Sequence, residues 1–102
     1  MDKLYKLAEG LRNRFPGGDD PYQMVTRLAE ECGEVASEVS HWENSGVKRQ
    51  KYGEPSKESL AGEIKNVLSA VITIAVHYGV QEELHRSIDD SLARLKAEGH
   101  ID

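Results

Sequence analysis

Two groups of oxygen-bearing side chains have a spacing that would bring them together if each group lies on a helix. The first group comprises Glu30, Glu31, Glu34 and Glu38, and the second comprises Glu63 and Asn66. Residues three apart on a helix lie about 5–6 Å from each other, so each group would hold a close pair of side chains. Mg²⁺ prefers oxygen ligands. Two antiparallel helices that offer Glu-x-x-Glu and Glu-x-x-Asn would fit this requirement.

A glutamate-rich helix often has a simpler explanation, namely an exposed acidic face that is solvated or paired with Lys and Arg. Two features favour a site instead. Glu31, Glu34 and Glu38 each directly precede an apolar residue of a predicted buried stripe, so they would line its edge. Glu63 lies near the start of an otherwise apolar helix and could face them.

These residues also carry a family resemblance. Residues 30–34 read Glu-Glu-Cys-Gly-Glu, and after 28 residues, 35–62, residues 63–66 read Glu-Ile-Lys-Asn. This pattern resembles the EExxE…ExxD signature of MazG-like all-α nucleoside triphosphate pyrophosphohydrolases. The similarity covers roughly residues 21 to 80. It implies an Mg²⁺-dependent hydrolysis of a (d)NTP to the monophosphate and pyrophosphate.

The resemblance also implies roles for individual residues. Glu31, Glu34 and Glu63 would bind Mg²⁺, or Mn²⁺ as an alternative, and Asn66 occupies the position of the fourth ligand. Glu30 or Glu34 would accept a proton from the attacking water. Trp42 would stack on the nucleobase, unless it continues the apolar stripe into the core or a subunit interface.

Two positions depart from the family pattern. Asn66 stands where the family has Asp, so an oxygen donor is kept but a negative charge is lost. The family's last helix often carries a phosphate-binding Lys and Asn, whereas residues 87–94 here contain Asp89 and Asp90. Lys51 and Arg94 are the candidate replacements. These departures leave open a weakened or inactive MazG-like module that binds a nucleotide or a partner without turnover.

A second enzyme class is suggested by two Glu-x-x-His sequences. They are Glu38 to His41 and Glu82 to His85. Di-iron carboxylate bundles combine such sequences with two further Glu residues. The short last helix makes this reading the weaker one.

The remaining sequence supplies the helices that would position these groups. Apolar spacing predicts helices over residues 2–14, 21–43 and 57–78 and a last helix around residues 84–95, with a basic loop over residues 44–55. Asp20, Ser56 and Gly79 supply the expected end signals. The stripe of the second helix, which we expect to be buried, comprises Val25, Leu28, Cys32, Val35, Val39 and Trp42.

Composition bounds the class of protein. The 102 residues are enough for one domain, 1–102, which we expect to be an all-α, four-helix MazG-like bundle. The net charge of −5 opposes binding to long nucleic acids. No apolar run is long enough to predict a membrane span, so a cytoplasmic location is expected. The helix over 57–78 is too apolar for a lone bundle to cover, which predicts a homodimer or homotetramer.

Overall fold

The chain is described by a computed structural model that covers residues 1–43 and 45–102, with side chains for residues 1–43 and 49–102. Every regular element in these residues is an α-helix. The helices are α1 (Asp2–Arg14), α2 (Pro21–Glu43), α3 (Ser45–Tyr52), α4 (Lys57–Tyr78) and α5 (Gln81–Ala97). The all-α prediction is therefore confirmed.

Local signals set the ends of the long helices where the sequence predicts them. Asp20 Oδ1 accepts a hydrogen bond of 2.9 Å from the Tyr22 amide at the start of α2. Ser56 Oγ accepts one of 3.0 Å from the Ser59 amide at the start of α4. Gly79 ends α4 in the left-handed conformation, with φ of 65°, which glycine adopts at little cost.

The segment predicted as a basic loop is mostly helical, so that prediction is wrong from residue 45 to residue 52. Asn44 lies outside the described residues. Arg49, Gln50 and Lys51 are good helix formers, and the flanking Asn, Ser, Gly and Pro residues hid this preference in the sequence. Contacts with the end of α2 also stabilise α3, since the rings of His41 and Tyr52 lie 6.3 Å apart.

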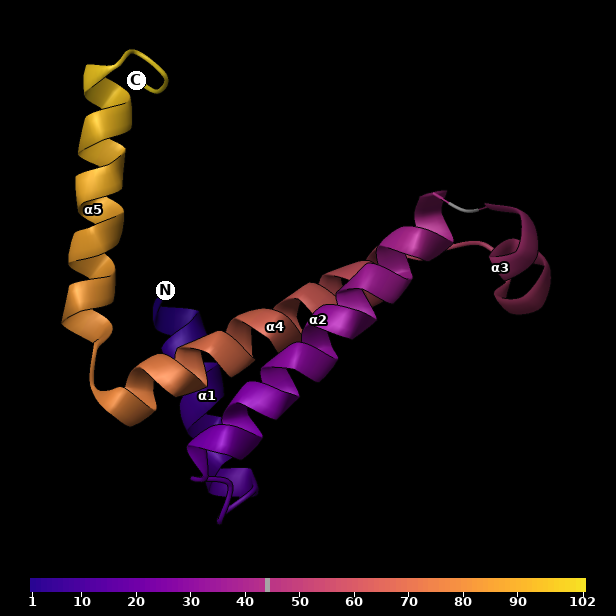
Figure 1. Cartoon of the computed structure of the whole chain (residues 1–102), viewed down its shortest axis with the longest axis horizontal. Coiled ribbons are helices and arrows are strands. Elements are labelled where there is room, and N and C mark those ends of the chain that lie inside the picture. Colours follow the sequence, from indigo (N-terminus) through magenta and orange to yellow (C-terminus); the bar gives the residue numbers. More distant parts are fainter. Residues whose placement is uncertain (44) are drawn as a thin grey trace.

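Helices α2 and α4 form the centre of the molecule and run antiparallel along most of their length (Figure 1). Helix α1 packs across α4 near one end of this pair, and α3 lies at the opposite end. Helix α5 leaves α4 at Gly79 and extends away from α2 and α3. It contacts the end of α4, and the ring of its His85 lies 5.6 Å from the ring of Tyr5 of α1. The four-helix bundle expected from the sequence is therefore not closed within one chain.

The core is small and the molecule is extended. Its radius of gyration is 17.0 Å, whereas a compact domain of this length has about 13 Å. The buried apolar residues are Ala8, Met24, Ala70, Ile72 and Ala75, and they lie where α1, α2 and α4 meet. Helix α5 has no buried residue.

The buried face of α2 is rotated from the predicted stripe. Leu28, Val35 and Trp42 are half-buried as expected, but Cys32 is exposed and Val25 and Val39 are 57% and 48% exposed. The prediction that these three are buried is wrong for the single chain. The half-buried positions are instead Leu28, Glu31, Val35, Glu38 and Trp42, with Met24 fully buried. Two glutamates thus lie within the face that packs on α4.

Helix α4 is the one helix in the described residues with the length and hydropathy of a membrane span. The central helix of a soluble bundle meets the same two criteria. In this chain α4 packs against α1 and α2 and carries Glu63, Lys65 and Asn66 in its first half. A single helix of this kind is weak evidence for a membrane span.

Candidate functional site

One hydrogen bond shows how α2 and α4 are aligned. Ser59 Oγ of α4 donates to Glu38 Oε1 of α2 over 2.8 Å. Because the helices are antiparallel and rise equally per residue, each step back along α2 from Glu38 matches a step forward along α4 from Ser59. Glu34 therefore stands level with Glu63, and Glu31 stands level with Asn66. The two groups singled out in the sequence lie at neighbouring levels of one helix pair.

The side chains at these two levels differ in exposure. Glu31, Glu63 and Asn66 are half-buried, whereas Glu34 is exposed. Within the described residues, the carboxylates of Glu31, Glu34 and Glu63 have no hydrogen bond or ion pair. Half-buried carboxylates without a basic partner are uncommon, because desolvation of a charge is costly unless another charge compensates it.

The donor set fits a hard divalent cation by its chemistry, since three carboxylates and one amide supply only oxygen ligands. The conformation of the described residues does not form a finished ligand shell, because no three His, Cys, Asp or Glu side chains among them converge closely enough to hold an ion. The unpaired glutamates have several rotatable side-chain bonds, so their carboxylates can occupy other rotamer positions.

A cavity of about 390 Å³ opens beside this level, between α1, α2 and α4. Glu30 and Glu31 lie on its wall together with two arginines, Arg12 of α1 and Arg27 of α2. The apolar part of the wall includes Phe15, which is 55% exposed. Of the two residues proposed as proton acceptors, Glu30 thus faces a cavity, and Glu34 lies one turn further along α2.

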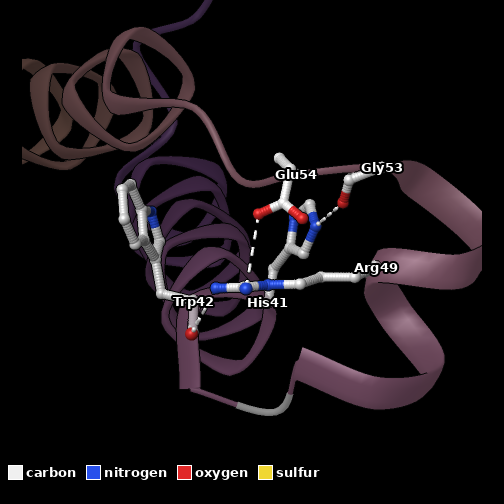
Figure 2. Close-up of polar contacts among 5 residues, drawn as sticks. All are labelled: His41, Trp42, Arg49, Gly53 and Glu54. Atoms are coloured by element: carbon white, nitrogen blue, oxygen red, sulfur yellow. Dashed lines mark hydrogen bonds and ion pairs between the residues drawn. The ribbon is translucent and has the colours of Figure 1, made fainter.

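The opposite end of the helix pair holds a second set of polar groups (Figure 2). His41 Nε2 donates to the Gly53 carbonyl over 2.8 Å. Arg49 reaches from α3 to Glu54, with 3.3 Å between Nη1 and Oε2, and donates to the Trp42 carbonyl over 3.5 Å. These contacts hold α3 against the last turn of α2.

Three buried polar atoms at this end lack a hydrogen-bond partner among the residues that the structure describes. They are Glu38 Oε2, Trp42 Nε1 and Arg49 Nε. Most buried polar atoms in folded proteins are paired, so an unpaired donor or acceptor in a native site calls for an explanation. A cavity of about 420 Å³ at this end is lined by Glu38, His41 and Tyr52, among others, but not by Trp42 or Arg49. Of the three unpaired atoms, only Glu38 Oε2, an acceptor, belongs to a residue that lines it.

Lys51 and Arg94, the candidate phosphate-binding residues, do not lie near the carboxylates of the same chain. The Lys51 ammonium lies 5.2 Å from the centre of the Tyr52 ring. Arg94 lies on α5, which makes no contact with α2. The two Glu-x-x-His sequences are likewise apart, because His41 is on α2 and His85 is on α5, where its Nε2 shares a hydrogen bond of 2.9 Å with Tyr5 Oη.

Several side chains that lie at these sites are not identified from the sequence alone. Arg27 precedes Glu31 by four residues and therefore shares its helix face, a spacing that could have indicated it. Arg12 joins the site only through the packing of α1, and Ser59 only through the alignment of α2 with α4. No local sequence signal predicts these two positions.

Comparison with known proteins gives no neighbour for the chain. No family model matches it, and no curated protein or solved structure is significantly similar.

Proposed function

We propose that the protein is a Mg²⁺-dependent nucleoside triphosphate pyrophosphohydrolase that converts a (d)NTP and water to a (d)NMP and pyrophosphate. The main support is the level pairing of Glu31 with Asn66 and of Glu34 with Glu63 across α2 and α4, with no basic residue among the described ones paired with these carboxylates. The MazG-like sequence pattern predicts ligands at the same four positions.

In this proposal Glu31, Glu34, Glu63 and Asn66 hold the metal, which is Mg²⁺ or Mn²⁺. When bound, the ion offsets the charge of the triphosphate and acidifies a water molecule. Glu30 or Glu34 accepts the proton of the water that attacks the α-phosphorus. The bond between this phosphorus and the bridging oxygen breaks, and pyrophosphate leaves with the electron pair. Both proton acceptors are exposed, so the proton can pass on to solvent.

The nucleobase is proposed to bind at the α3 end of the helix pair. Trp42 offers an aromatic surface, and Glu38, which lines the cavity of about 420 Å³, offers an Oε2 acceptor without a partner among the described residues. An aromatic surface and an acceptor suit a base, which stacks through its face and carries hydrogen-bond donors on its edge. Lys51, beside Tyr52, would contact the sugar or a phosphate near this end.

We further propose that the bundle is completed by self-association into a homodimer or homotetramer. The chain exposes 7602 Å², whereas a compact chain of 11.4 kDa exposes about 5,800 Å². The excess of about 1,800 Å² is larger than the roughly 800 Å² that each partner contributes to a standard interface. Ile64, Leu68 and Val71 are more than 40% exposed along one side of α4. Arg94 on α5 would approach a nucleotide only from such a partner.

An alternative from another class is a nucleotide-binding module without turnover. Asn66 favours it, because an amide at this level cannot supply the fourth negative charge for the metal. A cytoplasmic location, without a membrane or a long nucleic acid as partner, is proposed for both alternatives. The net charge of −5 is unfavourable for binding polyanions.

Pyrophosphate release from a panel of (d)NTPs, with Mg²⁺ and with EDTA, tests the proposal. We expect release from at least one nucleotide that requires Mg²⁺ or Mn²⁺. Nucleotide binding without release would support the non-catalytic module instead. Release that persists in EDTA would contradict the metal-dependent mechanism.

A further inference from the structure

The cavity between α1, α2 and α4 contains charges that the proposed metal site does not use. Arg12 and Arg27 line this cavity of about 390 Å³ together with Glu30 and Glu31. Arg27 lies four residues before Glu31 on α2, which is about 6 Å along the helix axis. A ligand bound near Glu31 would therefore extend directly onto Arg27.

Neither arginine is committed to a strong partner. Arg27 makes no hydrogen bond or ion pair with any described residue. Arg12 Nη2 lies 3.8 Å from Asp19 Oδ1, and both side chains are well exposed, at 40% and 71%. Exposed ion pairs at such distances contribute little stability. A ligand anion can replace Asp19 as the partner of Arg12 at low cost.

The combination of groups selects a particular kind of anion. A guanidinium group binds phosphate oxygens through two parallel hydrogen bonds, and it stays charged at any working pH. The neighbouring carboxylates of Glu30 and Glu31 would repel a bare anion from the same cavity. A phosphate chain that arrives with a divalent cation meets attraction from both sides, because the cation faces the carboxylates and the free oxygens face the arginines.

We propose that Arg27, assisted by Arg12, binds the terminal two phosphates of the substrate, which leave as pyrophosphate. This inference rests on the proposed function, and it assigns the leaving group to the α1 side of the metal level. Trp42 is 15 positions beyond Arg27, or about 22 Å along α2, so the base and the pyrophosphate lie on opposite sides of the carboxylates. The pair Arg12 and Arg27 takes the role expected from the sequence for Lys51 and Arg94.

Binding of inorganic pyrophosphate to the full chain, measured by isothermal titration calorimetry with and without Mg²⁺, tests this assignment. We expect the wild type to bind pyrophosphate only with Mg²⁺. Arg27→Gln should weaken binding at least tenfold, and Arg12→Gln should weaken it less. Arg27→Lys should fall between wild type and Arg27→Gln, because a lysine keeps the charge but loses the paired hydrogen bonds. Arg86→Gln, an exposed substitution on α5, is the matched control and should bind like the wild type.

The outcomes separate this inference from the proposed function. Absence of pyrophosphate binding in the wild type, equal binding by Arg27→Gln, or equal losses in Arg27→Gln and Arg86→Gln would overturn the assignment. Arg27 is exposed, so its replacement should leave the fold intact, which circular dichroism can verify. Pyrophosphate binding that depends on Arg27, in a protein that hydrolyses no nucleotide, would support the assignment and contradict the enzyme. Nucleotide hydrolysis by the wild type, together with unchanged pyrophosphate binding in Arg27→Gln, would support the enzyme and contradict the assignment of Arg27.

Discussion

Glu38 of α2 accepts a hydrogen bond of 2.8 Å from Ser59 of α4, and this pair defines how the two central helices are aligned. From that alignment Glu34 comes level with Glu63, and Glu31 with Asn66. Acidic residues from distant parts of the sequence thereby lie on one interface, while apolar residues of α4 such as Leu68 face outward. The arrangement suits a site inside the helix pair and a partner outside it.

Removal of the Ser59 hydroxyl should destabilise the helix pair. In Ser59→Ala, Glu38 Oε1 loses its hydrogen-bond donor. Glu38 Oε2 already lacks a partner among the described residues, so neither oxygen of this half-buried carboxylate would be paired. An unsatisfied group costs about 1–3 kcal/mol, and the exposure of Ser59 places the expected loss near 1 kcal/mol. Urea unfolding followed by circular dichroism measures it. Ser87→Ala on α5 is the control, and equal stability of the two variants would contradict the importance of this contact.

Helix ends were predictable from the sequence because their signals are local. Asp20, Ser56 and Gly79 each act on backbone groups within a few residues. The face of α2 that packs was not predictable, because it depends on the partner helix. The apolar spacing pointed to a stripe that includes Cys32, whereas packing on α4 turned Glu31 and Glu38 toward the interface and left Cys32 exposed.

The candidate site likewise has features that local spacing predicts and features that depend on packing between helices. The spacing of Glu31, Glu34, Glu63 and Asn66 predicts two pairs that can face each other, and the alignment of α2 with α4 brings them to neighbouring levels without forming a ligand cluster among the described residues. Arg12 could not be associated with Glu31 from the sequence, because only the packing of α1 against α4 brings it to the same cavity.

Self-association should depend on the exposed apolar side of α4. Leu68 is 44% exposed in the middle of this side, so Leu68→Glu would place a charge in an interface where desolvation is costly. We expect the wild type to be a dimer or tetramer and Leu68→Glu to shift toward the monomer in light scattering coupled to size exclusion. Lys57→Glu, in the first turn of the same helix, tests the effect of charge alone and should not dissociate the assembly. A monomeric wild type would refute self-association.

Trp42 is the only tryptophan in the chain, so its fluorescence reports on the α3 end alone. If the base stacks there, a nucleoside triphosphate with Mg²⁺ should change the emission, whereas inorganic pyrophosphate with Mg²⁺ should leave it nearly unchanged. A steady-state fluorescence titration with each ligand measures the change in emission. A response of the same size to both ligands would mean that Trp42 senses something other than the base.

In the proposed function, the carboxylates between α2 and α4 support metal-dependent hydrolysis, and Glu63 is one of them. Glu63→Gln keeps the size and hydrogen-bonding capacity of the side chain but removes its charge, and Glu83→Gln makes the same change on the exposed face of α5. Asn66→Asp adds the charge that the fourth position lacks, so it should increase turnover or metal affinity.

The most direct measurement is Mg²⁺-dependent pyrophosphate release by wild type, Glu63→Gln and Glu83→Gln at equal concentration. We expect at least a hundredfold loss in Glu63→Gln, which corresponds to about 2.7 kcal/mol of transition-state stabilisation, and wild-type activity in Glu83→Gln. Undiminished release by Glu63→Gln would exclude a role for the Glu63 carboxylate in metal-dependent hydrolysis.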